Sequence, residues 1–218
     1  MTHGFCILGW YFGEPFYRSV YEVAGDKYII SHRSEDHVAH LPVYGRIRQD
    51  LFYCENRGLD WGGYYQFNAM GFYRAYDFII YCHDDLIIND PDFAAVIADR
   101  FRDPHVKVIG NGGNGSDTEF HFSKYRHCMF FQDEDDYLVR TVRGSFFAAK
   151  TEIFDRLGNF PVYWKATKKL EKGNISLRNF AYLVTKHFGL DGIGYLDDRS
   201  WLNTQYLTEL CRGVQAQS

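Results

Sequence analysis

The chain has 218 residues, of which 46% are hydrophobic and 24% are charged, and this balance excludes a disordered or low-complexity protein. Lysine and arginine number 24 against 28 aspartates and glutamates, so the formal net charge of −4 gives no electrostatic footprint for nucleic acid. Aromatic residues make up 18%, enough for a core and for a site that stacks on bases or sugars. We expect one domain over residues 1–212, followed by a tail or linker at 213–218.

Targeting and redox signals are absent from the sequence. The five cysteines are scattered and form no C-x-x-C pair, which favours a reduced intracellular protein. The apolar run at 5–10 is short and has no basic residues before it, unlike a secretory signal. No run approaches the roughly 18 apolar residues of a membrane span. The sequence therefore predicts a cytoplasmic protein without a transmembrane segment.

Short apolar runs alternate with helical patterns along the chain, as is typical of an α/β sheet. Strands are predicted at 5–8, 27–31, 51–54, 77–82, 106–109, 137–142 and 145–149. Helices are predicted at 14–23, 60–75, 91–101, 151–157 and 176–188, with Asp60, Asp90, Thr151 and Ser176 as N-caps. The polar segment 116–136 is predicted to be a loop. The expected fold is α/β, a single domain with a mixed, mostly parallel central sheet flanked by helices.

The strongest candidate for chemistry is His83-Asp84-Asp85, directly after the apolar strand at 77–82. Open α/β sheets bind ligands at the carboxyl ends of their strands. Two adjacent carboxylates repel each other unless a cation neutralises them, and Mn²⁺ or Mg²⁺ prefers oxygen ligands together with substrate phosphates. The alternative is that both aspartates belong to a solvated turn.

A glycine-rich segment offers a second candidate. Residues 110–115 spell G-x-G-x-x-G after a predicted strand, the pattern of a dinucleotide-binding turn. That mechanism needs a helix to begin within the motif, so that its N-terminus meets the pyrophosphate. Residues 116–122 alternate between polar and apolar instead of showing a helical period. A flexible loop is the better interpretation, and an NAD-dependent oxidoreductase remains the alternative.

Three segments together resemble the GT-A glycosyltransferases, especially the family-2-like group that uses nucleotide sugars. Residues 56–58, followed by a helix with Asn68 and Gly71, resemble that family's N-x-G…N-x-G element. Residues 77–85 resemble its D-x-D-type strand, and residues 143–160 resemble its acceptor-side strand and following G-G-F-D-like turn. More weakly, the size and tyrosine content resemble a domain of the large algal-virus glycosyltransferases that modify capsid proteins, which would act in a host cytoplasm.

The resemblance implies a GT-A fold and a set of site residues. Asp85, together with Asp84, would hold Mn²⁺ or Mg²⁺ against the diphosphate of a UDP-sugar donor. The nucleotide-binding part would span about 1–90 and the acceptor-side part about 91–212. The residues implied to contact base, ribose, phosphate or sugar are Gly9, Trp10, Tyr11, His32, Arg33, Asn56, Arg57, Gly58, Asp60, Asp84, Gly144 and Ser145.

A catalytic base must come from elsewhere in the chain. An acidic pair follows the G-G-F-D turn in the family, whereas residues 161–164 here are Pro-Val-Tyr-Trp. Inversion requires a carboxylate that takes the proton of the acceptor hydroxyl. Asp197 and Asp198 follow the apolar run 193–196, which could form a strand beside the sheet, and they are the predicted catalytic residues. Alternatively, they cap the segment that begins at Arg199.

The predicted function is metal-dependent transfer of a sugar from a UDP-sugar to a saccharide acceptor. Two other classes remain as alternatives. One is the NAD-dependent oxidoreductase that would use residues 110–115. The other is a non-catalytic carbohydrate-binding module, because so many aromatic residues could serve a sugar-binding surface.

Overall fold

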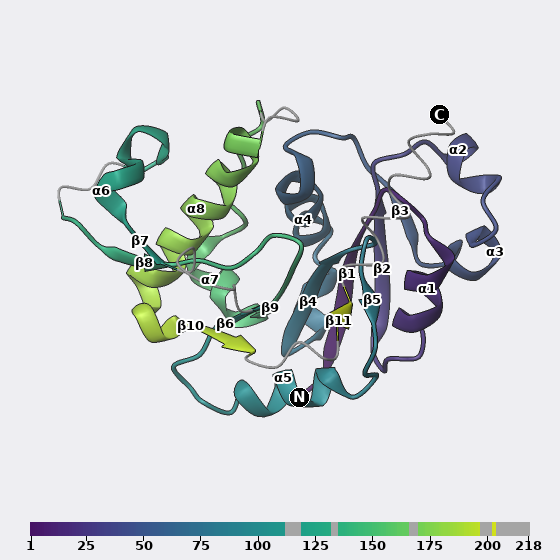
Figure 1. The fold of residues 1–218 in the computed structure, drawn as a ribbon, viewed down its shortest axis with the longest axis horizontal. Helices are drawn as coiled ribbons and strands as arrows, with labels where there is room; N and C mark the ends of the chain where they lie inside the picture. Colours follow the sequence, from purple (N-terminus) through teal and green to yellow (C-terminus); the bar gives the residue numbers. More distant parts are fainter. Residues whose placement is uncertain (112–118, 132–134, 166–169, 197–201, 204–218) are drawn as a thin grey trace.

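A computed structural model describes residues 1–111, 119–131, 135–165, 170–196 and 202–203 (Figure 1). Its central sheet has the strand order β10-β6-β9-β4-β1-β2-β3. All of these strands run parallel except β9, which is antiparallel to both β4 and β6. The strands are β1 (His3–Gly9), β2 (Asp26–Ser31), β3 (Leu51–Tyr53), β4 (Phe78–His83), β6 (Val108–Asn111), β9 (Phe146–Lys150) and β10 (Ile193–Leu196). The prediction of a mixed, mostly parallel sheet is confirmed.

Helices cover both faces of the sheet, because successive strand residues point to opposite sides and both sides are apolar. In β1, Phe5 and Ile7 pack into one core, and Cys6 and Leu8 pack into the other. The first core is covered by α1 (Glu14–Val20), α2 (Glu35–Ala39), α3 (Tyr44–Ile47) and α5 (Phe93–Arg100). The second is covered by α4 (Leu59–Met70), α7 (Phe154–Leu157) and α8 (Leu170–Phe188), with α4 and α8 side by side (Figure 1).

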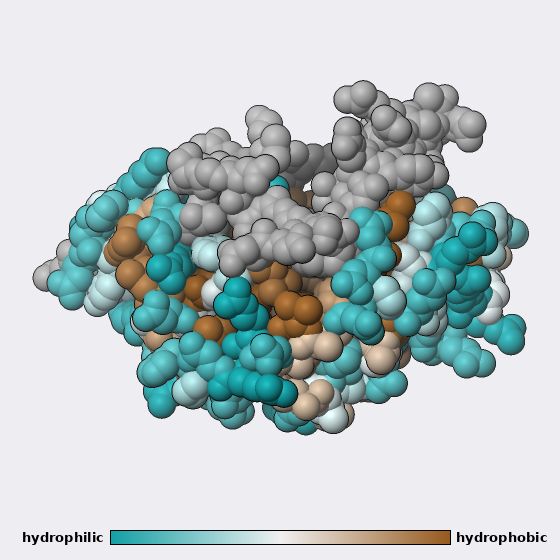
Figure 2. Space-filling view, turned by 60° about the horizontal axis from the view of Figure 1, so that its bottom comes forward, coloured by the Kyte–Doolittle hydropathy of each residue, from teal (hydrophilic) through white to brown (hydrophobic). Residues whose placement is uncertain are grey.

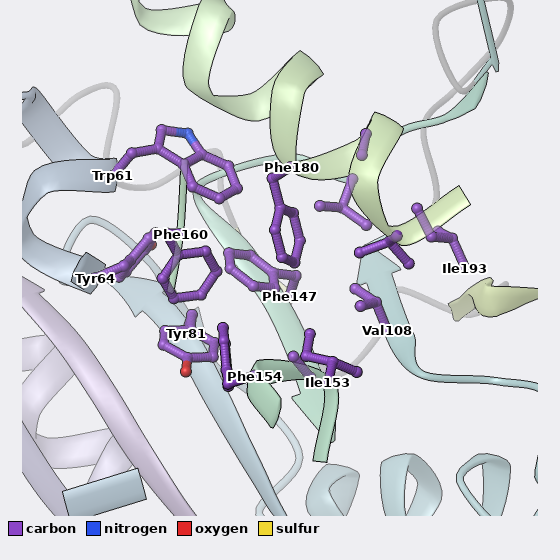
Figure 3. Close-up of a cluster of buried hydrophobic side chains, with 14 of the residues drawn as sticks. Trp61, Tyr64, Tyr81, Val108, Phe147, Ile153, Phe154, Phe160, Phe180 and Ile193 are labelled. Carbon is purple, nitrogen blue, oxygen red and sulfur yellow. The ribbon is translucent and has the colours of Figure 1, made fainter. Parts of the chain in front are cut away.

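The second core is largely aromatic (Figure 3). Phe147 of β9 lies at its centre, with ring centroids 4.9 Å from Tyr81 and 5.6 Å from Trp61 in stacked geometry. Phe160 and Phe180 close the cluster at 6.0 and 5.7 Å from Phe147. Such ring pairs add to the free energy gained from apolar burial. The cluster therefore joins α4 and α8 to the middle of the sheet.

The prediction of a loop at 116–136 is wrong for the described part of that segment. It contains β7 (Glu119–His121), which pairs antiparallel with β8 (Leu138–Arg140), and a short helix α6 (Phe122–Tyr125). Only the middle residue of β7 is buried. A two-stranded ribbon with one buried residue per strand needs few apolar residues. The mostly polar sequence therefore did not indicate a strand.

The other small elements complete the chain. β5 (Ile87–Ile88) pairs antiparallel with β11 (Leu202–Asn203) after the end of β4. The 3-10 turns are η1 (Phe72–Ala75), η2 (Arg126–Cys128), η3 (Thr151–Ile153) and η4 (Leu190–Gly192). The short strand expected at 193–196 is confirmed as β10, whereas the expected tail at 213–218 lies outside the described residues.

Two predicted N-caps in the first half are wrong. The N-cap of α4 is Gly58, in the left-handed conformation at φ 75°, so Asp60 lies inside the helix. The N-cap of α5 is Asp92, and Asp90 instead accepts a hydrogen bond from the Asp92 amide at 2.8 Å. In both cases the helix begins one or more residues away from the position that the capping rule indicated.

Two predicted N-caps in the second half are also wrong, because tertiary contacts occupy their hydroxyls. Thr151 donates its hydroxyl to the Tyr76 carbonyl at 2.6 Å. Ser176 is buried in the middle of α8, where its hydroxyl oxygen accepts a hydrogen bond from the Tyr163 amide at 2.8 Å. The glycine segment also begins differently from the prediction, since Gly110 and Asn111 belong to β6 and residues 112–115 lie outside the described part.

Figure 2 shows one face of the molecule, with hydrophilic residues around a band of hydrophobic residues next to the residues drawn in grey. Across the described residues, no helix combines the length and the hydropathy needed to cross a bilayer.

Candidate active site

A pocket of about 380 Å³ lies where β1 and β4 end and α4 begins. It brings together residues from four separate segments, because the carboxyl ends of parallel strands meet at one edge of the sheet. The pocket is lined by Leu8, Gly9, Trp10, Tyr11, His32, Asn56, Leu59, Asp60, His83, Asp84 and Asp85.

Asp84 is buried, and its carboxylate holds the loop that follows β1. Its Oδ2 atom accepts hydrogen bonds from the amides of Trp10, Tyr11 and Phe12 at 3.0, 3.1 and 2.7 Å. The Tyr17 hydroxyl donates to the same oxygen at 3.2 Å. Burial raises the pKa of the Asp84 carboxyl to about 6, although the amide donors act to lower it. Asp84 thus serves as the acceptor for three successive amides of this turn.

The backbone is strained on two sides of the pocket. In the described part of the chain, Phe12 at φ 56° and Leu59 at φ 55° are the non-glycine residues with positive φ. Phe12 belongs to the loop that Asp84 holds, and Leu59 lines the pocket itself. Such strain persists only where surrounding contacts enforce it, and it gathers at functional sites.

The neighbouring Asp85 has different surroundings. Its side chain is 32% exposed, and its Oδ1 atom is buried without a hydrogen-bond partner among the described residues. The His83 ring lies close to it, with its Nδ1 atom 3.8 Å from that oxygen. Asp85 therefore presents a carboxylate oxygen to the pocket that the described protein groups leave unpaired.

Two histidines and an aspartate complete the polar wall. The Nε2 atom of His83 lies 3.4 Å from Oδ2 of Asp60. Burial lowers the pKa of His83, but the nearby carboxylates, Asp60 foremost, raise it above its ordinary value overall. Burial raises the pKa of Asp60, yet His83 brings it below its ordinary value. His32 differs, since burial lowers its pKa, and its Nε2 atom has no partner among the described residues.

The remaining predicted contacts from the first half lie around the pocket without lining it. The Arg33 guanidinium lies 4.1 Å from the centroid of the Trp10 ring, and its Nε atom donates to the Trp10 carbonyl at 3.2 Å. Arg57 is exposed and lies 3.8 Å from Glu55. Gly58 forms the left-handed turn that begins α4.

Gly144 and Ser145 reach the pocket wall from the other half of the chain, because β9 begins at the edge where its neighbours end. The Gly144 carbonyl accepts a hydrogen bond from the Tyr64 hydroxyl at 2.6 Å. A Cβ atom added at Gly144 would lie 3.5 Å from Oδ2 of Asp60. The Ser145 carbonyl accepts the His83 amide at 3.0 Å. These two residues adjoin the pocket but do not line it.

Sequence reasoning missed part of the site. Leu8 and Leu59 line the pocket, and nothing in their sequence context indicates this. His83 was named with Asp84 and Asp85 as a candidate from the sequence, and it also lines the pocket. The predicted catalytic pair, Asp197 and Asp198, lies outside the described residues. β10, which precedes that pair, is separated from β4 by β6 and β9.

Two further sequence hypotheses can be placed on the structure. Across the described residues, no group of three or more His, Cys, Asp or Glu side chains could hold a metal ion. Gly110, the first glycine of the G-x-G-x-x-G pattern, pairs with Phe147 and Tyr195 inside the sheet and does not line the pocket.

Comparisons with known proteins give structural matches alone, since no family model and no curated protein sequence matches the chain. S. aureus TarS 1–349 in complex with UDP-GlcNAc has a TM-score of 0.56 at 12% identity, covering 93% of this chain and 58% of that one. Glucosyl-3-phosphoglycerate synthase from Mycobacterium tuberculosis, in complex with Mn²⁺, UDP and glucosyl-3-phosphoglycerate, has a TM-score of 0.56 at 12% identity, covering 99% and 77%.

A CMP:2-keto-3-deoxy-manno-octonic acid synthetase complexed with CTP is also similar, with a TM-score of 0.52 at 11% identity, covering 100% of this chain and 99% of that one. The chain thus spans under two thirds of the S. aureus structure and nearly the whole of the synthetase. None of these matches supports the resemblance to algal-virus proteins. They agree with the seven-stranded sheet on the fold: this chain has the GT-A-type fold of the nucleotide-sugar glycosyltransferases, as its sequence resemblance predicted.

Proposed function

We propose that this chain is a metal-dependent glycosyltransferase that moves a sugar from a UDP-sugar to a saccharide acceptor. The observation that carries the proposal is a pair of buried polar atoms in one pocket with no hydrogen-bond partner among the described residues, namely Asp85 Oδ1 and His32 Nε2. Buried polar atoms are costly unless something binds them. The pocket therefore suits a ligand with several charged oxygens. Proteins of the same fold bind UDP-GlcNAc, or UDP with Mn²⁺, which supports a nucleotide donor.

The residues present fit a divalent cation that has few protein ligands. Asp85 offers a carboxylate oxygen with no described partner, and Mn²⁺ or Mg²⁺ takes its other ligands from phosphates and water in such sites. The chemistry that the ion supplies when bound is neutralisation of charge on the departing diphosphate. Asp84 has a different role in this proposal, because its oxygens already accept amide hydrogen bonds and position the loop.

Other residues of the pocket would orient the donor. Asp60 fixes the His83 ring beside Asp85, and His32 has an Nε2 atom available for a ribose or phosphate oxygen. The Trp10 ring, backed by the Arg33 guanidinium, forms a rigid wall of the kind that stacks on a nucleotide base. Gly144 allows the chain to pass close to Asp60, where a side chain would narrow the sugar side of the pocket.

Asp197 and Asp198 remain the predicted source of the catalytic base. A group that acts only in the transition state lowers kcat while leaving the donor KM nearly unchanged. We therefore expect Asp197→Asn or Asp198→Asn to reduce turnover without weakening donor affinity. If both variants turn over normally, a retaining mechanism or a base from residues 133–136 becomes the better proposal.

Calorimetric titrations of the whole chain with UDP, CTP and NAD, each with and without Mn²⁺, test the function. We expect UDP to bind and Mn²⁺ to strengthen its binding. Release of UDP from UDP-glucose and UDP-N-acetylglucosamine without added acceptor provides a second readout, because it reports cleavage of the donor bond.

Each alternative function predicts a different result in the same titrations. NAD binding that ignores Mn²⁺ would favour the oxidoreductase. Binding of no nucleotide would favour the carbohydrate-binding module. Preferential binding of CTP, with pyrophosphate released in the presence of an acidic sugar, would favour the nucleotide-activating chemistry of the similar synthetase. Any of these outcomes would overturn the proposal.

A further inference from the structure

Two pairs of aromatic side chains, joined by the adjacent residues Tyr163 and Trp164, include rings that are exposed at the surface. Trp164 and Phe130 are each 42% exposed. The Tyr65 ring centroid lies 5.0 Å from that of Trp164, and the Tyr163 centroid lies 6.4 Å from that of Phe130. We call these four residues the aromatic platform. Large apolar side chains that gather at the surface mark binding sites more often than single exposed ones do.

The backbone beneath the aromatic platform is held by two buried polar side chains of α8. Ser176 accepts the Tyr163 amide at 2.8 Å, and Asn179 accepts the Phe130 amide at 2.7 Å. Asn179 also donates to the Cys128 carbonyl at 3.3 Å. The two side chains lie one helical turn apart, so a single face of α8 fixes both ring-bearing segments. The rings are therefore presented on an ordered backbone.

The first turn of α4 lies between the pocket and the Trp164 end of the aromatic platform. A Cβ atom at Gly58 would lie 2.5 Å from Cγ1 of Val162, and one at Gly62 would lie 3.7 Å from the Trp164 ring. The same turn carries Asp60 into the pocket wall. A molecule that lies on the platform would thus be adjacent to the edge of the donor pocket.

We propose that the aromatic platform is the acceptor subsite and binds a ring of a neutral saccharide by stacking. This inference rests on the proposed function. A sugar ring has an apolar C–H face that packs on an aromatic ring and polar edges that need hydrogen bonds, and the hydroxyls of Tyr65 and Tyr163 can supply some of these. The Tyr65 and Trp164 rings meet at 84°, so they are not stacked flat on each other. None of the four side chains carries a charge, which matches a neutral ligand.

The test measures binding of the whole chain to a printed array of neutral oligosaccharides, followed by calorimetry with the oligosaccharide that binds most strongly. Trp164→Ala and Phe130→Ala should each weaken binding about tenfold, as expected for truncation of a central aromatic contact. Trp164→Phe keeps a ring and should retain most of the affinity. Val96→Ala is the control, because Val96 is 51% exposed on α5, at the opposite face of the sheet, and should bind as the wild type does.

Two results would overturn the proposal. One is a wild-type chain that binds no oligosaccharide on the array, or one whose binding Trp164→Ala leaves unchanged. The other is Trp164-dependent sedimentation with phosphatidylcholine and phosphatidylglycerol vesicles in the absence of oligosaccharide binding, since the surface would then contact a membrane.

Titration of each variant with UDP and Mn²⁺ separates this inference from the proposed function. If oligosaccharide binding is absent while UDP binds, the acceptor subsite is wrong and the donor site stands. If UDP does not bind while oligosaccharide binding depends on Trp164, the glycosyltransferase proposal is wrong and the aromatic platform belongs to a sugar-binding module.

Discussion

In the pocket, polar atoms are buried without described partners, whereas on the aromatic platform apolar rings are exposed above a backbone whose amides are paired. The pocket thus has polar atoms that a polar ligand could bind, and the platform has apolar rings that an apolar surface could cover. Unpaired carboxylate and imidazole atoms suit a charged diphosphate and its cation. Exposed rings on a fixed backbone suit an uncharged ligand with an apolar face. Under the two proposals, the pocket and the aromatic platform would therefore bind ligands of different chemistry.

The largest expected effect comes from removing the carboxylate that the pocket leaves unpaired. Asp85→Ala should reduce donor cleavage on the order of 10³-fold, the loss typical of removing a group that stabilises charge in a transition state. It should also abolish the effect of Mn²⁺ on UDP binding, as measured by calorimetry. Asp36→Ala, which removes an exposed carboxylate on α2, is the control. A fully active Asp85→Ala variant would show that the Asp85 carboxylate holds no cation that the reaction needs.

Asp84→Ala should act on the fold rather than on the cation. The change leaves three loop amides and the Tyr17 hydroxyl without their acceptor. We expect the free energy of unfolding to fall by about 3 kcal/mol, measured by urea denaturation. Asp84→Asn keeps one acceptor oxygen and should lose less. If Asp84→Ala is as stable as wild type and loses only the Mn²⁺ effect, then Asp84 is a metal ligand like Asp85.

Ser176→Ala should affect the aromatic platform and leave the pocket unchanged. Loss of the acceptor for the Tyr163 amide should lower the free energy of unfolding by about 1–2 kcal/mol and weaken oligosaccharide binding a few-fold. UDP affinity, measured in the same preparation, should not change. Thr185→Val is a matched control on α8, because the buried Thr185 hydroxyl has no described partner to lose. Equal effects of both variants would show that the Ser176 contact is unimportant.

The smallest expected effect concerns the wall of the pocket. Arg33→Ala removes the guanidinium from the Trp10 ring and should cost about 1 kcal/mol, or roughly fivefold in UDP affinity. Arg33→Lys should restore little, because an ammonium group lacks the planar face that stacks on the ring. Oligosaccharide binding should be unaffected in both variants. A loss of oligosaccharide binding instead would show that the two regions are coupled.

Most of the sheet could be predicted from the sequence, because its strands are short apolar runs and both of its faces are buried. The errors arose where a contact from elsewhere in the chain decided the outcome. Serine is favoured at N-caps, but Ser176 lies inside α8, where its hydroxyl oxygen accepts a hydrogen bond from the Tyr163 amide. β7 has a single buried residue, so its sequence resembles a loop.

The candidate site could be predicted in its position but not in its detail. Asp84 and Asp85 are adjacent and chemically identical, so the sequence alone gives no basis for assigning them different roles. Their environments differ because the strained loop at Trp10–Phe12 folds over Asp84 alone. The left-handed conformation of Leu59, which brings that residue to the pocket, has no sequence signal, since a leucine rarely adopts it.

β9, the antiparallel strand of the seven-stranded sheet that the structure describes, determines how the chain can be divided. β9 lies between β4 and β6 and pairs with both, so residues 146–150 complete the sheet for strands that come much earlier in the sequence. A fragment that ended near residue 90 would expose the edge of β4, a buried and nearly continuous apolar strand. Such an edge pairs readily with other chains. A fragment of residues 1–90 is therefore expected to aggregate when it is produced without β9, and residues 78–150 should be kept together when the chain is engineered.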